Sequence, residues 1–133
     1  MSINSKQLVI GSTGSLGCAI VNELTSSGKP VRALVRNPEK AKKIFTSPDK
    51  VEMVEGSVED IQVLNKALNG IEIFHNCINV PYFQWSRLPE IHGRILEVAA
   101  RTKAKSACRF CANAFRAMLF ASLFRRRRFL QRR

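Results

Sequence analysis

Hydrophobic positions along most of the chain alternate between two periods. Short continuous apolar runs, the pattern of buried strands, are found at residues 6–10, 31–35, 51–55 and 71–78. Apolar residues at helical spacing and helix start and stop signals predict helices over residues 15–27, 38–45 and 87–103. A further helix is predicted in the residues that follow Ser57. Strands that alternate with helices form parallel β-α-β units with right-handed crossovers, so the pattern predicts an α/β fold.

Single residues predict the limits and faces of these helices. Gly28 ends the first helix, and Pro38 opens the second at a position where proline is favoured. Ser57 and Asp60 have the spacing of a capping box, which predicts a third helix that begins with Ser57 as its cap and ends at Gly70. The apolar residues at helical spacing in the first and third helices are Leu16, Ala19, Ile20 and Leu24, and Ile61, Leu64 and Leu68.

Charge is distributed unevenly along the 133 residues, a length that suits one domain. The formal net charge is +12, yet residues up to Lys105 hold 14 basic and 10 acidic side chains, and the last 28 residues hold 8 basic and no acidic ones. All seven glycines and all five prolines also precede Lys105. We therefore predict a domain at residues 1–105 and an arginine-rich tail at 106–133. An origin of the tail in a shifted reading frame or a fusion is a hypothesis.

The tail has three interpretations. The arginines between Arg125 and Arg133, with phenylalanines beside them, could bind RNA phosphates while the rings stack on bases. The apolar residues 117–124 could lie on an anionic membrane. An unselected extension is the simplest interpretation, and we favour it. Cys108 and Cys111 have the spacing of half a zinc site, but no second pair of ligands follows, so no metal is predicted.

Sequence features also bear on location. No basic segment followed by a long apolar run opens the chain, so no secretory signal peptide is predicted. No apolar run approaches the ~20 residues that a membrane-spanning helix needs. Four cysteines without such a signal are typical of free thiols in a reducing compartment. We therefore expect a cytoplasmic protein without a membrane span.

The clearest motif lies between the first strand and the first helix, where Gly11, Gly14 and Gly17 are three residues apart. Such a loop lets phosphates approach the backbone N–H groups at the helix start without meeting a Cβ atom, and the helix dipole favours their negative charge. The last glycine allows the helix to pack closely on the strand. The motif therefore predicts a dinucleotide-binding loop, in preference to a glycine-rich turn that holds no ligand.

With this motif, the sequence resembles the short-chain dehydrogenase/reductase superfamily, specifically its extended and atypical branches. These include epimerase/dehydratase-like proteins and NAD(P)H-binding reductase-like proteins. The resemblance covers residues 6–105 and is carried by residues 9–17, 31–37, 54–60 and 73–80. It implies a Rossmann-like parallel sheet with helices on both faces, of which the chain would contain the first four β-α units. The implied strand order is 3-2-1-4, with the fourth strand left as an edge.

The end of the second strand bears on the choice of cofactor. NAD-specific sites place an acidic residue there, on the ribose hydroxyls, but this chain has Arg36 and no Asp or Glu. The planar guanidinium of an arginine suits a 2′-phosphate, so the resemblance implies that Arg36 selects NADP over NAD, with Lys40 as a helper. The alternative is a solvated surface arginine. The full set of cofactor contacts implied by the resemblance is Gly11, Ser12, Thr13, Gly14, Ser15, Leu16, Gly17, Arg36, Ser57, Val58, Cys77, Ile78 and Asn79.

Catalysis in this superfamily uses a Tyr-x-x-x-Lys pair beyond the fifth strand, in which the lysine lowers the pKa of the tyrosine. The single tyrosine, Tyr82, follows the fourth strand directly and has Ser86 four residues later, so it is expected to be a loop aromatic. No catalytic residue is predicted. His75 is expected to pack in the core, and His92 has no metal-ligand partner at suitable spacing.

We therefore expect the adenosine-binding half of an NAD(P)-dependent epimerase/dehydratase or reductase-like protein, inactive by itself. A small-molecule substrate would bind only in a full-length parent. Two alternatives remain open: a non-catalytic NADP-sensing or scaffold protein, and a nucleic-acid binder that acts through the arginine tail.

Overall fold

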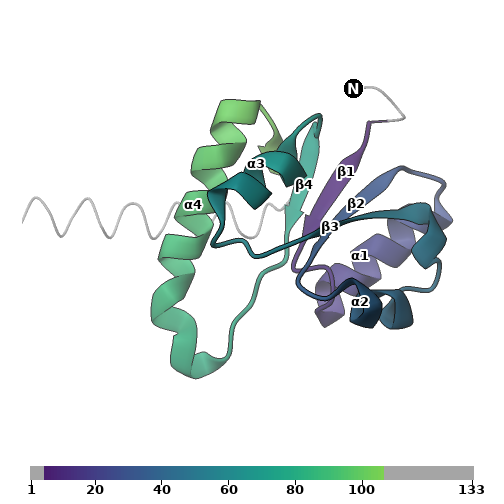
Figure 1. Ribbon diagram of the computed structural model, residues 1–133, viewed down its shortest axis with the longest axis horizontal. Coiled ribbons are helices and arrows are strands. Elements are labelled where there is room, and N and C mark those ends of the chain that lie inside the picture. Colours follow the sequence, from purple (N-terminus) through teal and green to yellow (C-terminus); the bar gives the residue numbers. More distant parts are fainter. Residues whose placement is uncertain (1–4, 107–133) are drawn as a thin grey trace, which may run out of the picture.

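The computed structural model describes residues 5–106, which form a parallel sheet with helices on both faces (Figure 1). The strands are β1 (Gln7–Ile10), β2 (Val31–Val35), β3 (Val51–Glu55), β4 (Ile73–Asn76) and β5 (Lys105–Ser106). The α-helices are α1 (Ser15–Ser26), α2 (Pro38–Ile44), α3 (Ile61–Leu68) and α4 (Leu88–Thr102). Two 3-10 helices, η1 (Pro48–Lys50) and η2 (Tyr82–Arg87), precede β3 and α4.

The strand order is β3-β2-β1-β4-β5, and all pairings are parallel. In the central strand, Val9 lies opposite Ala33 of β2 and His75 of β4. This topology is a Rossmann-like α/β fold, which confirms the predicted fold class. The predicted order of the first four strands is also confirmed.

The prediction that β4 is left as an edge is wrong. Lys105 and Ser106 form a fifth strand that pairs with Ile73 and Phe74. The chain reaches this position because Lys103 ends α4 in the left-handed conformation, with φ 60°, after which the Lys105 N–H donates to the Glu72 carbonyl at 2.7 Å. The rest of the predicted tail, residues 107–133 with Cys108, Cys111 and the terminal arginines, lies outside the described residues.

The two faces of the sheet bury separate apolar clusters, since side chains alternate along a strand. Leu8 and Ile10 pack on the side of α3 and α4, whereas Val9 packs on the side of α1 and α2. Figure 1 shows these two pairs of helices on opposite sides of the sheet. Because β1 is buried on both faces, all three of these residues are apolar and fully inaccessible to solvent.

The helix boundaries agree with the sequence to within a residue or two for α1, α2 and α4, but two local predictions are wrong. The buried face of α1 is formed by Gly17, Val21, Leu24 and Thr25, so of the predicted apolar residues only Leu24 is buried. Helix α3 begins at Ile61 with Asp60 as its cap, and Ser57 does not cap it. Strand β4 is also shorter at both ends than the predicted run of residues 71–78.

No helix within residues 5–106 is long and apolar enough to span a membrane.

Candidate functional site

A cavity of about 680 Å³ lies at the carboxyl ends of the strands. It is bounded by the glycine loop after β1, the end of β2, the loop after β3, the segment after β4, η2 and the first turn of α4. Strand order reverses direction at β1, which pairs with β2 on one side and β4 on the other. In open α/β sheets this switch point is where ligands bind.

The glycine loop is shaped by two close backbone approaches. Gly11 has φ +76°, and a Cβ atom added there would lie 2.6 Å from the Cys77 carbonyl oxygen. A Cβ atom on Gly17 would lie 2.1 Å from the Gly11 carbonyl oxygen. The loop therefore touches the segment after β4 on one side and the first turn of α1 on the other, and both contacts require glycine.

The first turn of α1 opens on the cavity. Gly14 is the N-cap residue, no side chain caps the helix, and no acidic residue lies in its first turn. Thr13, Gly14, Ser15 and Leu16 are exposed and line the cavity. The partial positive charge at the start of this 12-residue helix therefore faces the cavity, as an anion-binding loop requires.

Two of the seven residues predicted in this loop are buried and do not line the cavity. Ser12 is fully buried, and its hydroxyl donates to the Leu34 carbonyl oxygen at 3.1 Å, which ties the loop to β2. Gly17 is buried against Gly11. The other five, Gly11, Thr13, Gly14, Ser15 and Leu16, line the cavity.

Arg36 follows the last residue of β2 and lines the cavity beside Leu34 and Val35. Its side chain is exposed, and the next residue, Asn37, caps α2 by accepting from the Lys40 N–H at 3.1 Å. Lys40, the predicted helper, does not line the cavity. The only cation at the end of β2 that borders the described cavity is therefore Arg36.

The loop after β3 supplies another wall through Gly56, Ser57, Val58 and Glu59. The Gly56 N–H donates to the Val35 carbonyl oxygen at 2.9 Å, which joins this loop to the end of β2. The Ser57 hydroxyl accepts from the Glu59 N–H at 3.2 Å. Ser57 and Val58, two of the implied cofactor contacts, therefore line the cavity.

The segment after β4 forms the opposite wall with Cys77, Ile78 and Asn79. The Cys77 N–H donates to the Ile10 carbonyl oxygen at 2.9 Å, so this segment stays next to the glycine loop. Asn76, only 5% exposed, accepts from the Ile78 N–H at 3.4 Å and donates through Nδ2 to Nδ1 of His92 at 2.6 Å. Burial lowers the pKa of His92, which keeps its ring neutral and able to accept this hydrogen bond.

Several cavity residues were not found from the sequence. The guanidinium of Arg87 pairs with the carboxylate of Glu59, and both residues line the cavity together with Gln84 and Ile91. These residues come from η2 and α4, and nothing in their local pattern signals that they meet the loop after β3. Tyr82 was predicted to be a loop aromatic, but it is the first residue of the 3-10 helix η2; it is 80% exposed and does not line the cavity.

Comparison with known families accords with this geometry. The model of the NmrA-like family matches residues 4–106, which is most of the chain. The chain belongs to the NmrA-like family. This assignment confirms the predicted resemblance, because NmrA-like proteins are an NAD(P)-binding group within the extended short-chain dehydrogenase/reductases.

Solved structures resemble the NmrA-like chain in fold. AtPrR2 with NADP+ and (+)pinoresinol has 24% identity and a TM-score of 0.62, over 77% of this chain and 34% of that one. An isoflavone reductase has 23% identity and a TM-score of 0.65, and the match covers 92% of this chain and 45% of the reductase chain. A Rossmann-fold NAD(P)-binding family protein from Shigella flexneri has 17% identity and a TM-score of 0.64, and the match covers 77% of this chain and 49% of the Shigella chain.

The NmrA-like chain therefore spans between about a third and a half of the length of these structures. No curated protein matches the sequence significantly.

Proposed function

We propose that this NmrA-like chain binds a dinucleotide cofactor, NADP(H) in preference to NAD(H), and that residues 1–105 form the binding unit. The observation that carries the proposal is the uncapped start of α1, which opens with the glycine loop on a cavity that Arg36 also borders. A helix start of this kind favours the diphosphate, and a guanidinium favours the 2′-phosphate.

The residues of the cavity suit the parts of such a cofactor. The backbone of the glycine loop, from Gly11 to Leu16, would hold the diphosphate, because no side chain at Gly11 or Gly14 blocks its approach. Arg36 would hold the 2′-phosphate. Ser57 and Val58 would contact the adenine, and Cys77, Ile78 and Asn79 would line the path toward the nicotinamide.

The proposed class of reaction follows from the same fit. A bound nicotinamide cofactor supplies a hydride or accepts one. We place the chain with reductase- or epimerase-type proteins, in which a carbonyl or sugar substrate would exchange that hydride. The contribution of the described residues is to bind and orient the adenosine and diphosphate, and none of them is assigned a catalytic role.

The test is a titration of the chain with NADPH and NADH, monitored by calorimetry. Arg36→Ala removes the charge-assisted hydrogen bonds to the 2′-phosphate, so NADPH affinity should fall by about tenfold or more while NADH affinity changes little. Lys43→Ala is a matched control, because Lys43 is an exposed cation of α2 that does not line the cavity. Its affinities for both cofactors should remain those of the wild type.

Equal losses of NADPH and NADH affinity in Arg36→Ala would refute the 2′-phosphate role of Arg36. Absence of binding of either cofactor to the wild-type chain would refute the proposed function as a whole.

A further inference from the structure

Backbone hydrogen bonds fix both ends of the loop after β3. Gly56 has φ +150°, and its N–H is bonded to Val35 of β2. At the other end, the Asp60 N–H donates to the Ser57 carbonyl oxygen at 3.1 Å, and the Asp60 side chain caps α3. Between these two ends, Ser57, Val58 and Glu59 line the cavity.

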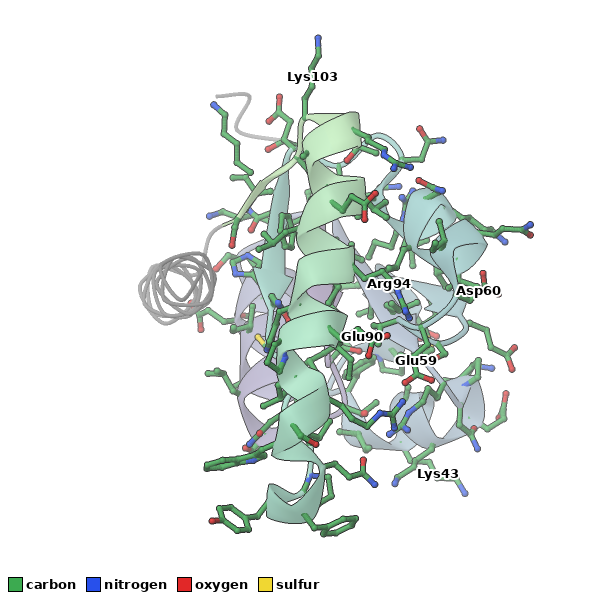
Figure 2. All side chains as sticks on the ribbon, turned by 90° about the vertical axis from the view of Figure 1, so that its left-hand side faces the viewer. Lys43, Glu59, Asp60, Glu90, Arg94 and Lys103 are labelled. Atoms are coloured by element: carbon green, nitrogen blue, oxygen red, sulfur yellow. The ribbon has the colours of Figure 1, made fainter. Side chains whose placement is uncertain are left out.

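A side chain of helix α4 is hydrogen-bonded to the backbone of the same loop. Arg94 donates through Nη1 to the backbone carbonyl oxygen of Glu59 at 3.0 Å and through Nη2 to Oε1 of Glu90 at 3.0 Å. Arg87, the last residue of η2 and the residue before α4, pairs with the Glu59 carboxylate. Figure 2 shows Arg94 and Glu90 on α4 directed toward the loop that carries Glu59 and Asp60.

We propose that Arg94 is a positioning residue for the wall formed by Ser57, Val58 and Glu59, and so for the affinity of the adenosine end of the site. This inference rests on the proposed function. Arg94 does not itself line the cavity. Its planar guanidinium fixes the Glu59 carbonyl relative to α4, while Glu90 fixes the guanidinium, so the backbone of the wall is held in one position before a ligand arrives.

The contacts of Arg94 fit positioning better than general stabilisation. Its side chain is 28% exposed and its partner Glu90 is 74% exposed, and ion pairs at such positions add little to the free energy of unfolding. The bond to Glu59 instead joins α4 to the backbone of the loop after β3, 35 residues earlier in the sequence. Removal of Arg94 should therefore loosen the wall more than it weakens the fold.

Two variants test this inference in the full 133-residue chain. Arg94→Met keeps the apolar stem and removes both hydrogen bonds, and Arg94→Lys keeps the charge but cannot reproduce the planar fork. Arg101→Met is the matched control, because Arg101 also lies on α4 and makes an i,i+4 pair, with Glu97 at 2.5 Å, but touches neither the loop nor the cavity. Each variant is titrated with NADPH, and amide hydrogen exchange of residues 56–60 is followed without ligand.

We expect Arg94→Met to lose roughly three- to tenfold in NADPH affinity and to exchange faster at residues 56–60, with an unchanged thermal unfolding midpoint. Arg94→Lys should lie between Arg94→Met and the wild type, and Arg101→Met should match the wild type in all three measurements. If Arg94→Met does not fold, Arg94→Lys tests the same point by a smaller loss of NADPH affinity and faster exchange at residues 56–60, both relative to the wild type.

Wild-type NADPH affinity in both Arg94 variants would overturn the inference and leave the proposed function standing. Faster exchange throughout the protein, with a lowered unfolding midpoint, would show that Arg94 stabilises the whole fold, and this result would also overturn the inference. A wild-type chain that binds no dinucleotide would overturn the proposed function and this inference together.

Discussion

At the scale of single residues, the glycines of the loop differ in what surrounds them. A Cβ atom on Gly17 would overlap the Gly11 carbonyl oxygen at 2.1 Å, whereas a Cβ atom on Gly14 would lie at 3.4 Å from the same oxygen. Gly14 has ordinary extended backbone angles and lines the cavity. Gly17 therefore serves the packing of α1, and Gly14 serves access to the helix start.

Gly17→Ala should lower the free energy of unfolding by about 1–3 kcal/mol, because the added methyl group forces α1 away from the loop. Gly14→Ala should change it by less than about 1 kcal/mol and yet abolish tight NADPH binding, because the new methyl group stands at the approach to the helix start. Urea unfolding and NADPH titration of both variants check these expectations. Equal losses of stability would contradict this division of roles.

The cavity residues that sequence analysis predicted are those whose positions are set by the local sequence. The glycine spacing and Arg36 are visible because a loop between a strand and a helix imposes them on consecutive residues. Glu59 and Arg87 were not found, because their meeting depends on how α4 packs beside α3, and their separation of 28 residues leaves no periodic signal. Ser12 was assigned to the ligand because the motif does not show that its hydroxyl is already bonded to Leu34.

At the scale of elements, the start of α3 shows how a small shift changes the role of a residue. The predicted cap was Ser57, but Asp60 is the N-cap, and its carboxylate accepts from the N–H groups of Gln62 at 2.8 Å and Val63 at 3.4 Å. Ser57 instead lies in the loop and lines the cavity. Its hydroxyl accepts from the Glu59 N–H and from no N–H group of α3.

Asp60→Ala should lower the free energy of unfolding by about 1 kcal/mol, because two N–H groups of α3 lose their acceptor. Ser57→Ala should cost less than about 0.5 kcal/mol, because no helix end depends on it. Asp60→Asn is the matched control, since its amide oxygen can accept the same bonds and stability should be nearly retained. A larger loss in Ser57→Ala than in Asp60→Ala would restore the predicted capping box.

The buried face of α1 was also wrongly predicted, and the reason is the rotation of this helix about its own axis. Leu16 and Ala19 have helical spacing with Leu24, but Leu16 is 61% exposed because the first turn of α1 borders the cavity. The close approach of Gly17 to Gly11 then sets the rotation of the helix, and Val21 and Leu24 follow it into the core. Periodicity cannot distinguish an apolar residue that lines a cavity from one that is buried in the core.

At the scale of the whole molecule, two half-buried histidines join separate strands and helices. His75 in β4 donates through Nε2 to Oε1 of Gln7 in β1 at 2.8 Å, and His92 in α4 accepts from Asn76 in β4. Burial lowers the pKa of both rings below the ordinary value of 6.5. The folded chain therefore binds fewer protons than the unfolded chain just below that pH.

The free energy of unfolding should consequently be at its full value above pH 6.5 and fall as the pH is lowered from 6.5 toward 5. Protonation also turns the Nδ1 acceptor of His92 into a donor that faces the Asn76 amide nitrogen, so His92 contributes a lost hydrogen bond as well as a desolvation cost. Urea unfolding at pH 7, 6 and 5 measures this slope directly.

The paired carboxylate of Glu52 titrates below this range. Hydrogen bonds from Lys6, and secondarily from Arg32, lower the pKa of Glu52 below 4.5, so its contribution is lost only at more acidic pH. His92→Gln keeps an oxygen that can accept from Asn76 and does not titrate, and should reduce the slope between pH 7 and 5. Addition of His75→Asn should remove most of what remains. An undiminished slope in the double variant would show that the fall in stability arises from other groups.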